Sequence, residues 1–448
     1  MKRFTFVVVC YCFISMWAWG AETPSDIERY WPQWRGPHAT GVAPHSDPAV
    51  EWAEDNNVRW KLEIPGQGHA SPIVWNETVF VTTAIETDKP VEPQMNEAAP
   101  QSPRRRRGPR TIQPTKVLKF VLLAIDRRDG SIQWQRTARE ELPHEGTHPD
   151  GSWAANSPVT DGEHIYAYFG SRGLYCFDMQ GALKWEKDLG DMTTKLGFGE
   201  GSSPVLYGDT IVVNWDHEGS SFIVALDKIT GEERWKVDRD ETTSWATPIV
   251  VDHNGKPQVI TSATKRVRSY DLATGELIWE SSGMTANAIP SPVATKDMVY
   301  VTSGFRGNAL HAIRLADAKG EITDSDAVVW QYDRDTPYVP SPLLYGDALY
   351  FLKHNQGILS CFNAQTGEAY YGPQRLEGIT GVYASPVGAR DRVYLVGRNG
   401  TTLVIKRGPE FEVLATNSLD DRFEASPAIV DNEIYLRGRK YLYCIAHN

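Results

Sequence analysis

The chain has 448 residues, of which 41% are hydrophobic and 23% are charged, and its formal net charge is −11. This composition is that of a folded globular protein and excludes a disordered or membrane-embedded chain. The acidic balance also argues against nucleic acid or an anionic membrane surface as the main partner.

The first twenty residues have the pattern of an export signal. Two basic residues precede an uncharged, mostly apolar run (4–19), and the tripeptide Ala-Trp-Gly ending at residue 20 offers a small-x-small cleavage site. The apolar run is shorter than the ~20 residues that span a bilayer. We therefore predict a signal peptide over 1–20, with an uncleaved anchor as the alternative, and a periplasmic or secreted protein.

After the signal, the chain repeats one unit. Each unit has an apolar run such as HIYAYFG, a second such as LYCFD, a turn such as MQG, and then a run with one tryptophan. Four short strands separated by turn residues are typical of one β-propeller blade. A Ser-Pro or Thr-Pro pair opens the unit eight times, at 71–72, 157–158, 203–204, 247–248, 291–292, 341–342, 385–386 and 426–427.

The two ends of the array complement each other. The last unit stops after its third strand, YLYCIA (441–446), and the segment NNVRWKLEI (56–64) is a fourth strand without the other three. Pairing them would complete a blade and cover both sheet edges. We predict an all-β fold over residues 21–448: an eight-bladed propeller of four-stranded antiparallel blades, closed by the N-terminal strand.

One segment interrupts the first blade between its second and third strands. Residues 86–115 are rich in proline and contain RRRRGPR (104–110), so they bury too little surface to fold. We predict a disordered insertion there. It is either a solvated loop or a cationic tether for an acidic partner.

Three prominent features of the sequence have a structural explanation and need no catalytic or binding role: the repeated tryptophans, the cysteines and an H-E-x-x-H sequence. Tryptophan recurs once per blade in the same strand, at 134, 185, 235, 279 and 330, which indicates packing between blades. The cysteines at 176, 361 and 444 occupy a third-strand position that is alanine in other blades. The H-E-x-x-H sequence at 144–148 lies between two prolines in a connection, so we interpret it as a surface loop and not a zinc helix.

Candidate binding residues lie in the connections that emerge on one face of a propeller, namely fourth-to-first and second-to-third. An acidic protein thereby gathers cations and aromatic rings around one mouth, which suits an anionic, ring-bearing or extended ligand. The alternative is that these side chains pack locally. The candidates are His69, Trp153, Asn156, Arg172, Glu200, Trp245, Arg266, Arg306, Tyr338, His354, Tyr383, Arg398 and Glu424. Further cations expected there are Lys265, Lys353, Arg437 and Arg439.

The repeat pattern SPV…DG…VY…LYxxD…TGe…W, over about residues 50–446, resembles that of the quinoprotein (PQQ-like) eight-bladed propellers. That superfamily includes periplasmic alcohol dehydrogenases that use pyrroloquinoline quinone, and non-enzymatic assembly lipoproteins of the BamB type. The opening WPQWRGPHATG (31–41) is similar to exported PQQ-repeat proteins of planctomycete-type bacteria.

For catalysis, the resemblance implies a disulfide between adjacent cysteines, an aromatic floor, a calcium ion held by carboxylate and amide, and an aspartate base. No two cysteines are adjacent here, and only Glu200, Asn214 and Asp216 offer an acid and amide group. We therefore expect no catalytic residue, cofactor or metal, and a non-catalytic exported propeller that binds a protein, peptide or glycan partner in the cell envelope. The alternatives are a quinoprotein oxidoreductase that uses pyrroloquinoline quinone with calcium, and a BamB-like envelope assembly scaffold.

Overall fold

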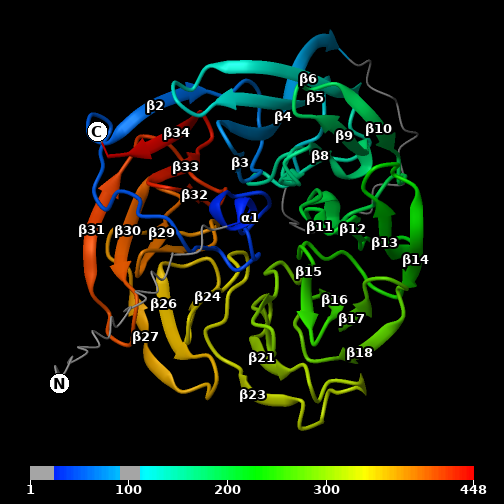
Figure 1. Ribbon diagram of the computed structural model, residues 1–448, viewed down its shortest axis with the longest axis vertical. Coiled ribbons are helices and arrows are strands. Elements are labelled where there is room, and N and C mark those ends of the chain that lie inside the picture. Colours follow the sequence, from blue (N-terminus) through cyan, green and yellow to red (C-terminus); the bar gives the residue numbers. More distant parts are fainter. Residues whose placement is uncertain (1–24, 91–110, 448) are drawn as a thin grey trace, which may run out of the picture.

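The computed structural model describes residues 25–90 and 111–447, which form eight sheets arranged in a ring (Figure 1). Four antiparallel strands make up each blade, and the first strand of each lies nearest the ring axis. The helical elements of the described residues are short: α1 (Asp26–Arg29) and two single turns, at Gly170–Arg172 and Lys195–Gly197. The predicted all-β, eight-bladed propeller is confirmed.

The blades follow the chain in order. Blade 1 contains β3 (Ile73–Trp75), β4 (Thr78–Pro90), β5 (Lys116–Asp126) and β6 (Ile132–Glu141); blade 2 contains β7 (Val159–Thr160), β8 (His164–Tyr168), β9 (Leu174–Asp178) and β10 (Leu183–Lys187). Blade 3 contains β11 (Val205–Tyr207), β12 (Thr210–Trp215), β13 (Ser221–Asp227) and β14 (Glu233–Arg239); blade 4 contains β15 (Ile249–His253), β16 (Lys256–Thr261), β17 (Val267–Asp271) and β18 (Leu277–Ser281). Blade 5 contains β19 (Val293–Ala294), β20 (Met298–Ser303), β21 (Ala309–Arg314) and β23 (Val328–Tyr332); blade 6 contains β24 (Leu343–Tyr345), β25 (Ala348–Leu352), β26 (Ile358–Asn363) and β27 (Ala369–Arg375). Blade 7 contains β28 (Val387–Ala389), β29 (Arg392–Val396), β30 (Thr401–Lys406) and β31 (Val413–Ser418); blade 8 contains β32 (Ala428–Val430), β33 (Glu433–Arg437), β34 (Tyr441–Ala446) and β2 (Val58–Glu63).

The N-terminal strand closes the ring as predicted. Strand β2 pairs antiparallel with β34, with Trp60 opposite Cys444 and Lys61 opposite Tyr443. The pairing gives blade 8 its fourth strand and covers an edge of β34 that would otherwise expose unpaired backbone groups. Residues more than 380 positions apart in sequence thereby become neighbours in one sheet.

A closed ring of hydrogen bonds joins the inner ends of the blades. The backbone N–H of each Ser or Thr in the Ser/Thr-Pro pairs donates to the hydroxyl oxygen of its counterpart in the next blade, at 2.9–3.0 Å. All eight residues are buried, and the proline that follows has no N–H to leave unpaired there. The hydroxyl ring, as we call it, comprises Ser71, Ser157, Ser203, Thr247, Ser291, Ser341, Ser385 and Ser426.

The repeated tryptophans join the blades farther out. The indole N–H of Trp185, for example, donates to Lys228 O of the next blade at 3.0 Å, and the ring packs on Gly231. That glycine has φ +71° and ends the turn between the third and fourth strands, and a Cβ there would lie 2.7 Å from the indole. Trp279 differs: its N–H donates to Gln258 in its own blade, because the short strand β22 (Gly320–Glu321) pairs beside it.

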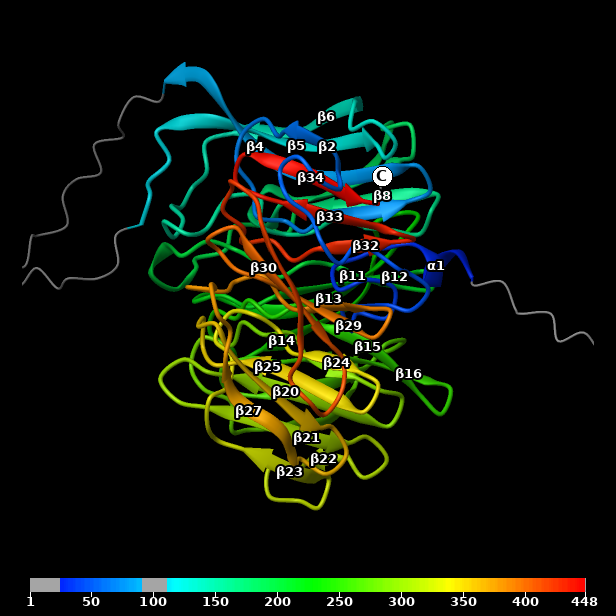
Figure 2. The ribbon, with the colours of Figure 1, turned by 90° about the vertical axis from the view of Figure 1, so that its left-hand side faces the viewer.

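An N-terminal strap, residues 25–57, crosses the ring axis. Helix α1 lies at the centre of the ring in Figure 1. In the side view of Figure 2, α1 lies on one face of the ring and the C-terminal end of β4 extends from the other face. Strand β1 (Val42–Ala43) of the strap pairs in parallel with β28. The buried Arg35 guanidinium donates to Pro342 O at 2.5 Å and Pro386 O at 2.7 Å, at the inner ends of two blades. Burial lowers the pKa of Arg35 to about 9, so it remains charged at neutral pH.

The predicted insertion and signal peptide lie largely outside the described residues. Residues 86–90 continue β4 and pair with β5, with Glu86 opposite Leu118, and residues 91–110 are not described. The signal peptide over 1–20 and the disorder of 91–110 therefore stay predictions. Within the described ranges, no helix is long and apolar enough to cross a membrane.

Replacing Ser203 by Ala tests the hydroxyl ring. The change removes the acceptor of the buried Ser157 N–H, so we expect it to cost about 1–3 kcal/mol of the free energy of unfolding. Chemical denaturation measures the effect. The control is Ser418→Ala, at an exposed position in β31, and equal stability of the two variants would contradict a structural role for the ring.

Candidate functional site

The central cavity lies on the ring axis and has a volume of about 280 Å³. All eight residues of the hydroxyl ring line the cavity, and Trp34 of the strap lines its end on the strap side. Its walls come from the connections between blades on the opposite face, which is the face predicted to carry the site. A second hollow, of about 980 Å³, lies between the strap and the inner strands of several blades.

The structure brings six of the thirteen predicted site residues to the central cavity. These six are His69, Glu200, Trp245, Tyr338, Tyr383 and Glu424. Of the others, Trp153, Asn156 and Arg172 line a small side cavity, and Arg398 lies behind Tyr383, with its guanidinium carbon 3.9 Å from the ring centroid. Arg266, Arg306 and His354 do not line the central cavity.

The aromatic side chains of the wall are held in place by specific contacts. The indole N–H of Trp245 donates to Gly199 O at 2.7 Å, and Tyr338 stacks on Phe305 with ring centroids 4.9 Å apart. The Tyr383 hydroxyl donates to Asp150 at 3.3 Å. Rings fixed in this way present apolar surface without a large loss of conformational entropy on binding.

Two carboxylates that line the cavity are each contacted by the same three arginines, and we call this group the arginine cluster. Asp150 lies 2.6 Å from Arg398, 2.7 Å from Arg422 and 3.5 Å from Arg439. Glu424 lies 2.7 Å from Arg422 and 3.1 Å from each of the other two guanidinium groups. The arginines come from blades 7 and 8, whereas Asp150 comes from the connection between blades 1 and 2.

The loop with the H-E-x-x-H sequence supplies Asp150. His144 Nε2 donates to Met192 O at 2.6 Å and its Nδ1 contacts Arg172, while His148 Nδ1 accepts the Asp150 N–H at 3.0 Å. Both ring nitrogens of His144 and the Nδ1 atom of His148 therefore stabilise the conformation of the loop. Among residues 25–90 and 111–447, no three His, Cys, Asp or Glu side chains form a group that could hold a metal ion.

The acid and amide group singled out in the sequence is also engaged. Glu200 accepts from Ser171 N–H at 2.7 Å and Ser171 Oγ at 2.5 Å, and burial raises its pKa. Asp216 accepts from Arg239 Nε at 2.8 Å, and Asn214 Nδ2 donates to Asp216 at 3.1 Å. Asn214 Oδ1 is buried without a partner in the described structure.

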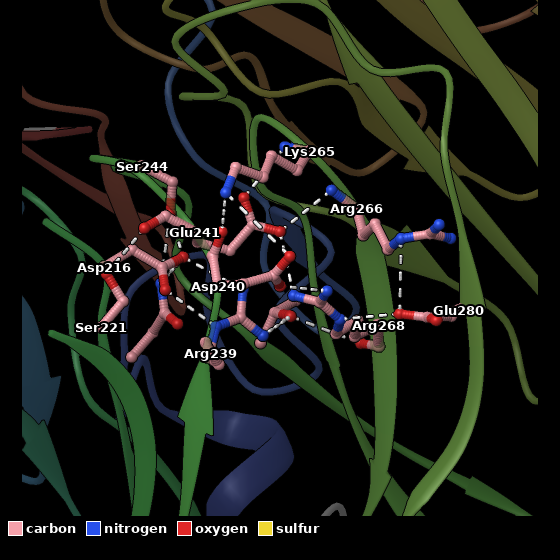
Figure 3. Close-up of polar contacts among 12 residues, drawn as sticks. Asp216, Ser221, Arg239, Asp240, Glu241, Ser244, Lys265, Arg266, Arg268 and Glu280 are labelled. Atoms are coloured by element: carbon pink, nitrogen blue, oxygen red, sulfur yellow. Dashed lines mark hydrogen bonds and ion pairs between the residues drawn. The ribbon is translucent and has the colours of Figure 1, made fainter. Parts of the chain in front are cut away.

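An ion network between blades 3 and 4 neutralises other cations of this face (Figure 3). Arg268 contacts Asp240 at 2.5 Å, Glu241 at 3.0 Å and Glu280 at 2.9 Å. The backbone N–H groups of Lys265 and Arg266 donate to Glu241, and Arg266 also pairs with Glu280 and with Glu321. These cations therefore hold loops together and are not free charges at the mouth.

His69 lies on the cavity wall with its Nε2 4.0 Å from Glu424, and its side chain is 16% exposed. Burial is the main cause that lowers its pKa to about 4, and the cations of Arg437 and Arg439 act in the same direction. The Glu424 and Asp150 carboxylates oppose this shift. The imidazole is therefore neutral at pH 7.

Sequence reasoning missed several residues of the site. Trp34 lies before the first strand and reaches the cavity only because the strap folds under the ring. Phe198, Asp150 and Arg422 lie in fourth-to-first connections, one of the two kinds from which the predicted residues were drawn, so their position was an available signal. Nothing local distinguishes Asp150 from the many other turn aspartates.

The chain also resembles known proteins in sequence and in fold. A family model described as outer membrane protein assembly factor BamB matches residues 119–282 and 219–447, which together exceed half of the chain. The chain belongs to this BamB family. No curated protein sequence matches it significantly.

Solved structures share the fold at low identity. BamB from Moraxella catarrhalis is 12% identical with a TM-score of 0.54, over 86% of this chain and 99% of that one. Quinohemoprotein alcohol dehydrogenase from Comamonas testosteroni is 10% identical with a TM-score of 0.60, over 94% and 81%. Quinohemoprotein alcohol dehydrogenase ADHIIG from Pseudomonas putida HK5 is 11% identical with a TM-score of 0.53, over 94% and 76%. The likeness extends to the fold alone.

Replacing Asp216 by Asn tests the buried ion pair with Arg239, whose two side chains are both 0% exposed. A buried guanidinium that loses its counter-charge destabilises the fold by about 3–5 kcal/mol, which we expect as a clear fall in Tm. The matched control is Asp209→Asn, because Asp209 is 68% exposed in its pair with Arg234. Equal Tm values for the two variants would contradict this assignment.

The low pKa of His69 predicts a stability that depends on pH. Between about pH 6.5 and pH 4 the unfolded chain takes up a proton at this residue and the folded chain does not, so acidification destabilises the fold. His69→Gln should lose less stability than the wild type over this window, as measured by Tm against pH. The control is His45→Gln at an exposed position, and an unchanged slope in His69→Gln would overturn the prediction.

Proposed function

We propose that the protein is a non-catalytic binding scaffold of the cell envelope, which holds a protein partner by an extended segment inserted into the central cavity. The observation that carries the proposal is the cavity itself, which Trp34 lines at one end and aromatic side chains and the two carboxylates of the arginine cluster line at the other. A small hollow with fixed rings and a few polar groups suits one or two side chains of a partner. Membership of the BamB family favours a partner in the envelope.

The polar groups around the cavity support binding over catalysis. Glu200 is held by Ser171, and Asp150 and Glu424 are shared by three arginines. None of these carboxylates is left as a free base by its contacts. A catalytic site would instead require an acid, base or nucleophile poised for a substrate atom.

The residues do not fit the calcium ion that a quinoprotein dehydrogenase requires. Calcium takes six to eight oxygen ligands, whereas Asp216 is neutralised by Arg239 and Glu200 is bonded to Ser171. Only Asn214 Oδ1 is a buried free oxygen of this group. We therefore derive no reaction step through a quinone. The fold likeness to alcohol dehydrogenases keeps this alternative testable: uptake of pyrroloquinoline quinone with calcium, seen as a new absorption band, would contradict the proposal.

Aromatic substitutions in the cavity test the scaffold. Trp245→Ala and Tyr338→Ala should each reduce retention of the partner from envelope extract by about tenfold or more, because buried aromatic anchors dominate interface energies. Quantitative mass spectrometry of the retained proteins measures the effect, and Tm checks the fold. The control is Tyr207→Ala, which alters the hollow on the strap side. Loss of retention with Tyr207→Ala alone would contradict the proposal, because it would place the partner at the hollow on the strap side and not in the central cavity. Retention that survives protease treatment of the extract would indicate a glycan ligand and not a protein.

A further inference from the structure

The arginine cluster joins blades 7 and 8 to the connection between blades 1 and 2, on the other side of blade 1. Arg398 lies in the β29–β30 hairpin, Arg439 in the β33–β34 hairpin and Arg422 in the connection between blades 7 and 8. Asp150 reaches them from the connection between blades 1 and 2. Its carboxylate is held by these arginines and by the Tyr383 hydroxyl.

The two carboxylates of the cluster differ in how firmly they are built in. Glu424 is 3% exposed, two residues before a member of the hydroxyl ring, and all three arginines contact it within 3.1 Å. Asp150 is 26% exposed and lies on a loop, and every ion-pair partner it has in the described structure belongs to blade 7, to blade 8 or to the connection between them. Glu424 is therefore a fixed counter-charge, and Asp150 is the carboxylate that a ligand can replace.

The ion pairs of the cluster contain one more cation than anion. Three guanidinium groups share two carboxylates, and the nearby Arg437, 2% exposed, forms no ion pair in the described structure. Arg437 donates to Thr82 O at 2.5 Å, its Nε is buried without a partner, and its charge acts on His69 in the cavity wall. Guanidinium groups arranged in this way match the two oxygens of a planar carboxylate.

We propose that Asp150 occupies a carboxylate-binding site formed by Arg398, Arg422, Arg439 and the Tyr383 hydroxyl, and that a carboxylate of the partner segment competes with Asp150 for it. This inference rests on the proposed function, because the bound segment would lie in the same central cavity. The neighbouring wall contains Phe198, Trp245 and Tyr338. The residue beside the carboxylate is therefore apolar or aromatic.

The experiment uses purified protein and benzoate, which joins a carboxylate to an aromatic ring. Calorimetric titration compares the wild type with Asp150→Ala and with Asp150→Asn, which keeps the side-chain shape if the alanine variant is unstable. We expect both variants to bind benzoate at least tenfold more tightly than the wild type, because the internal carboxylate is gone. Adding Arg422→Gln to either variant should return the affinity to the wild-type level. Equal affinity in wild type and both variants would overturn the proposal.

Three short peptides then identify the source of the carboxylate. N-acetyl-Gly-Phe has a free C-terminal carboxylate, its C-terminal amide has none, and N-acetyl-Phe-Asp amide has only a side-chain carboxylate. Tighter binding of the first by Asp150→Ala indicates a chain terminus, and tighter binding of the third indicates an acidic side chain. Equal binding of all three would overturn the proposal. These measurements need no cellular partner, so their failure is distinguishable from failure of the scaffold function in the retention assay.

Discussion

The hydroxyl ring is the constraint on which the rest of this structure depends. Eight backbone N–H groups each find their acceptor in the next blade, so every blade starts at the same depth and distance from the axis. The ring closes only because β2 completes blade 8 beside blade 1. Arg35 of the strap then donates to carbonyl groups at the inner ends of two blades. Since the same ring lines the central cavity, the architecture and the candidate site share one set of contacts.

The face above this ring consists of connections that neutralise one another. Arg268 and its carboxylates hold blades 3 and 4 together (Figure 3). The arginine cluster holds blades 7 and 8 to the loop of Asp150. These ion pairs join connections of different blades and so stabilise the rim. A rigid rim around a small aromatic cavity is a suitable surface for holding a partner segment, because little conformational freedom remains to be lost on binding.

Low identity with a shared fold has a physical explanation in this chain. The three solved structures described above are 10–12% identical to it. The contacts that recur between the blades of this chain are few: a hydroxyl before each first strand, and in most blades a large ring of the fourth strand against the next blade. The connections are free to differ, and they carry the candidate site. Membership of the family therefore defines the architecture, whereas the identity of the ligand depends on these connections.

The sequence by itself determined the eight blades, their closure by residues 56–64, the tryptophan packing and the connections in which the candidate site lies. These features follow from local rules, because strand alternation and turn residues repeat within each unit of the chain. Only the tertiary structure decided which side chains meet. Asp150 and Arg422 are 272 residues apart, and the carboxylates that neutralise Arg266 lie in strands β18 and β22. Ion pairs and the path of the strap depend on where distant loops lie in space, and no local pattern encodes that position.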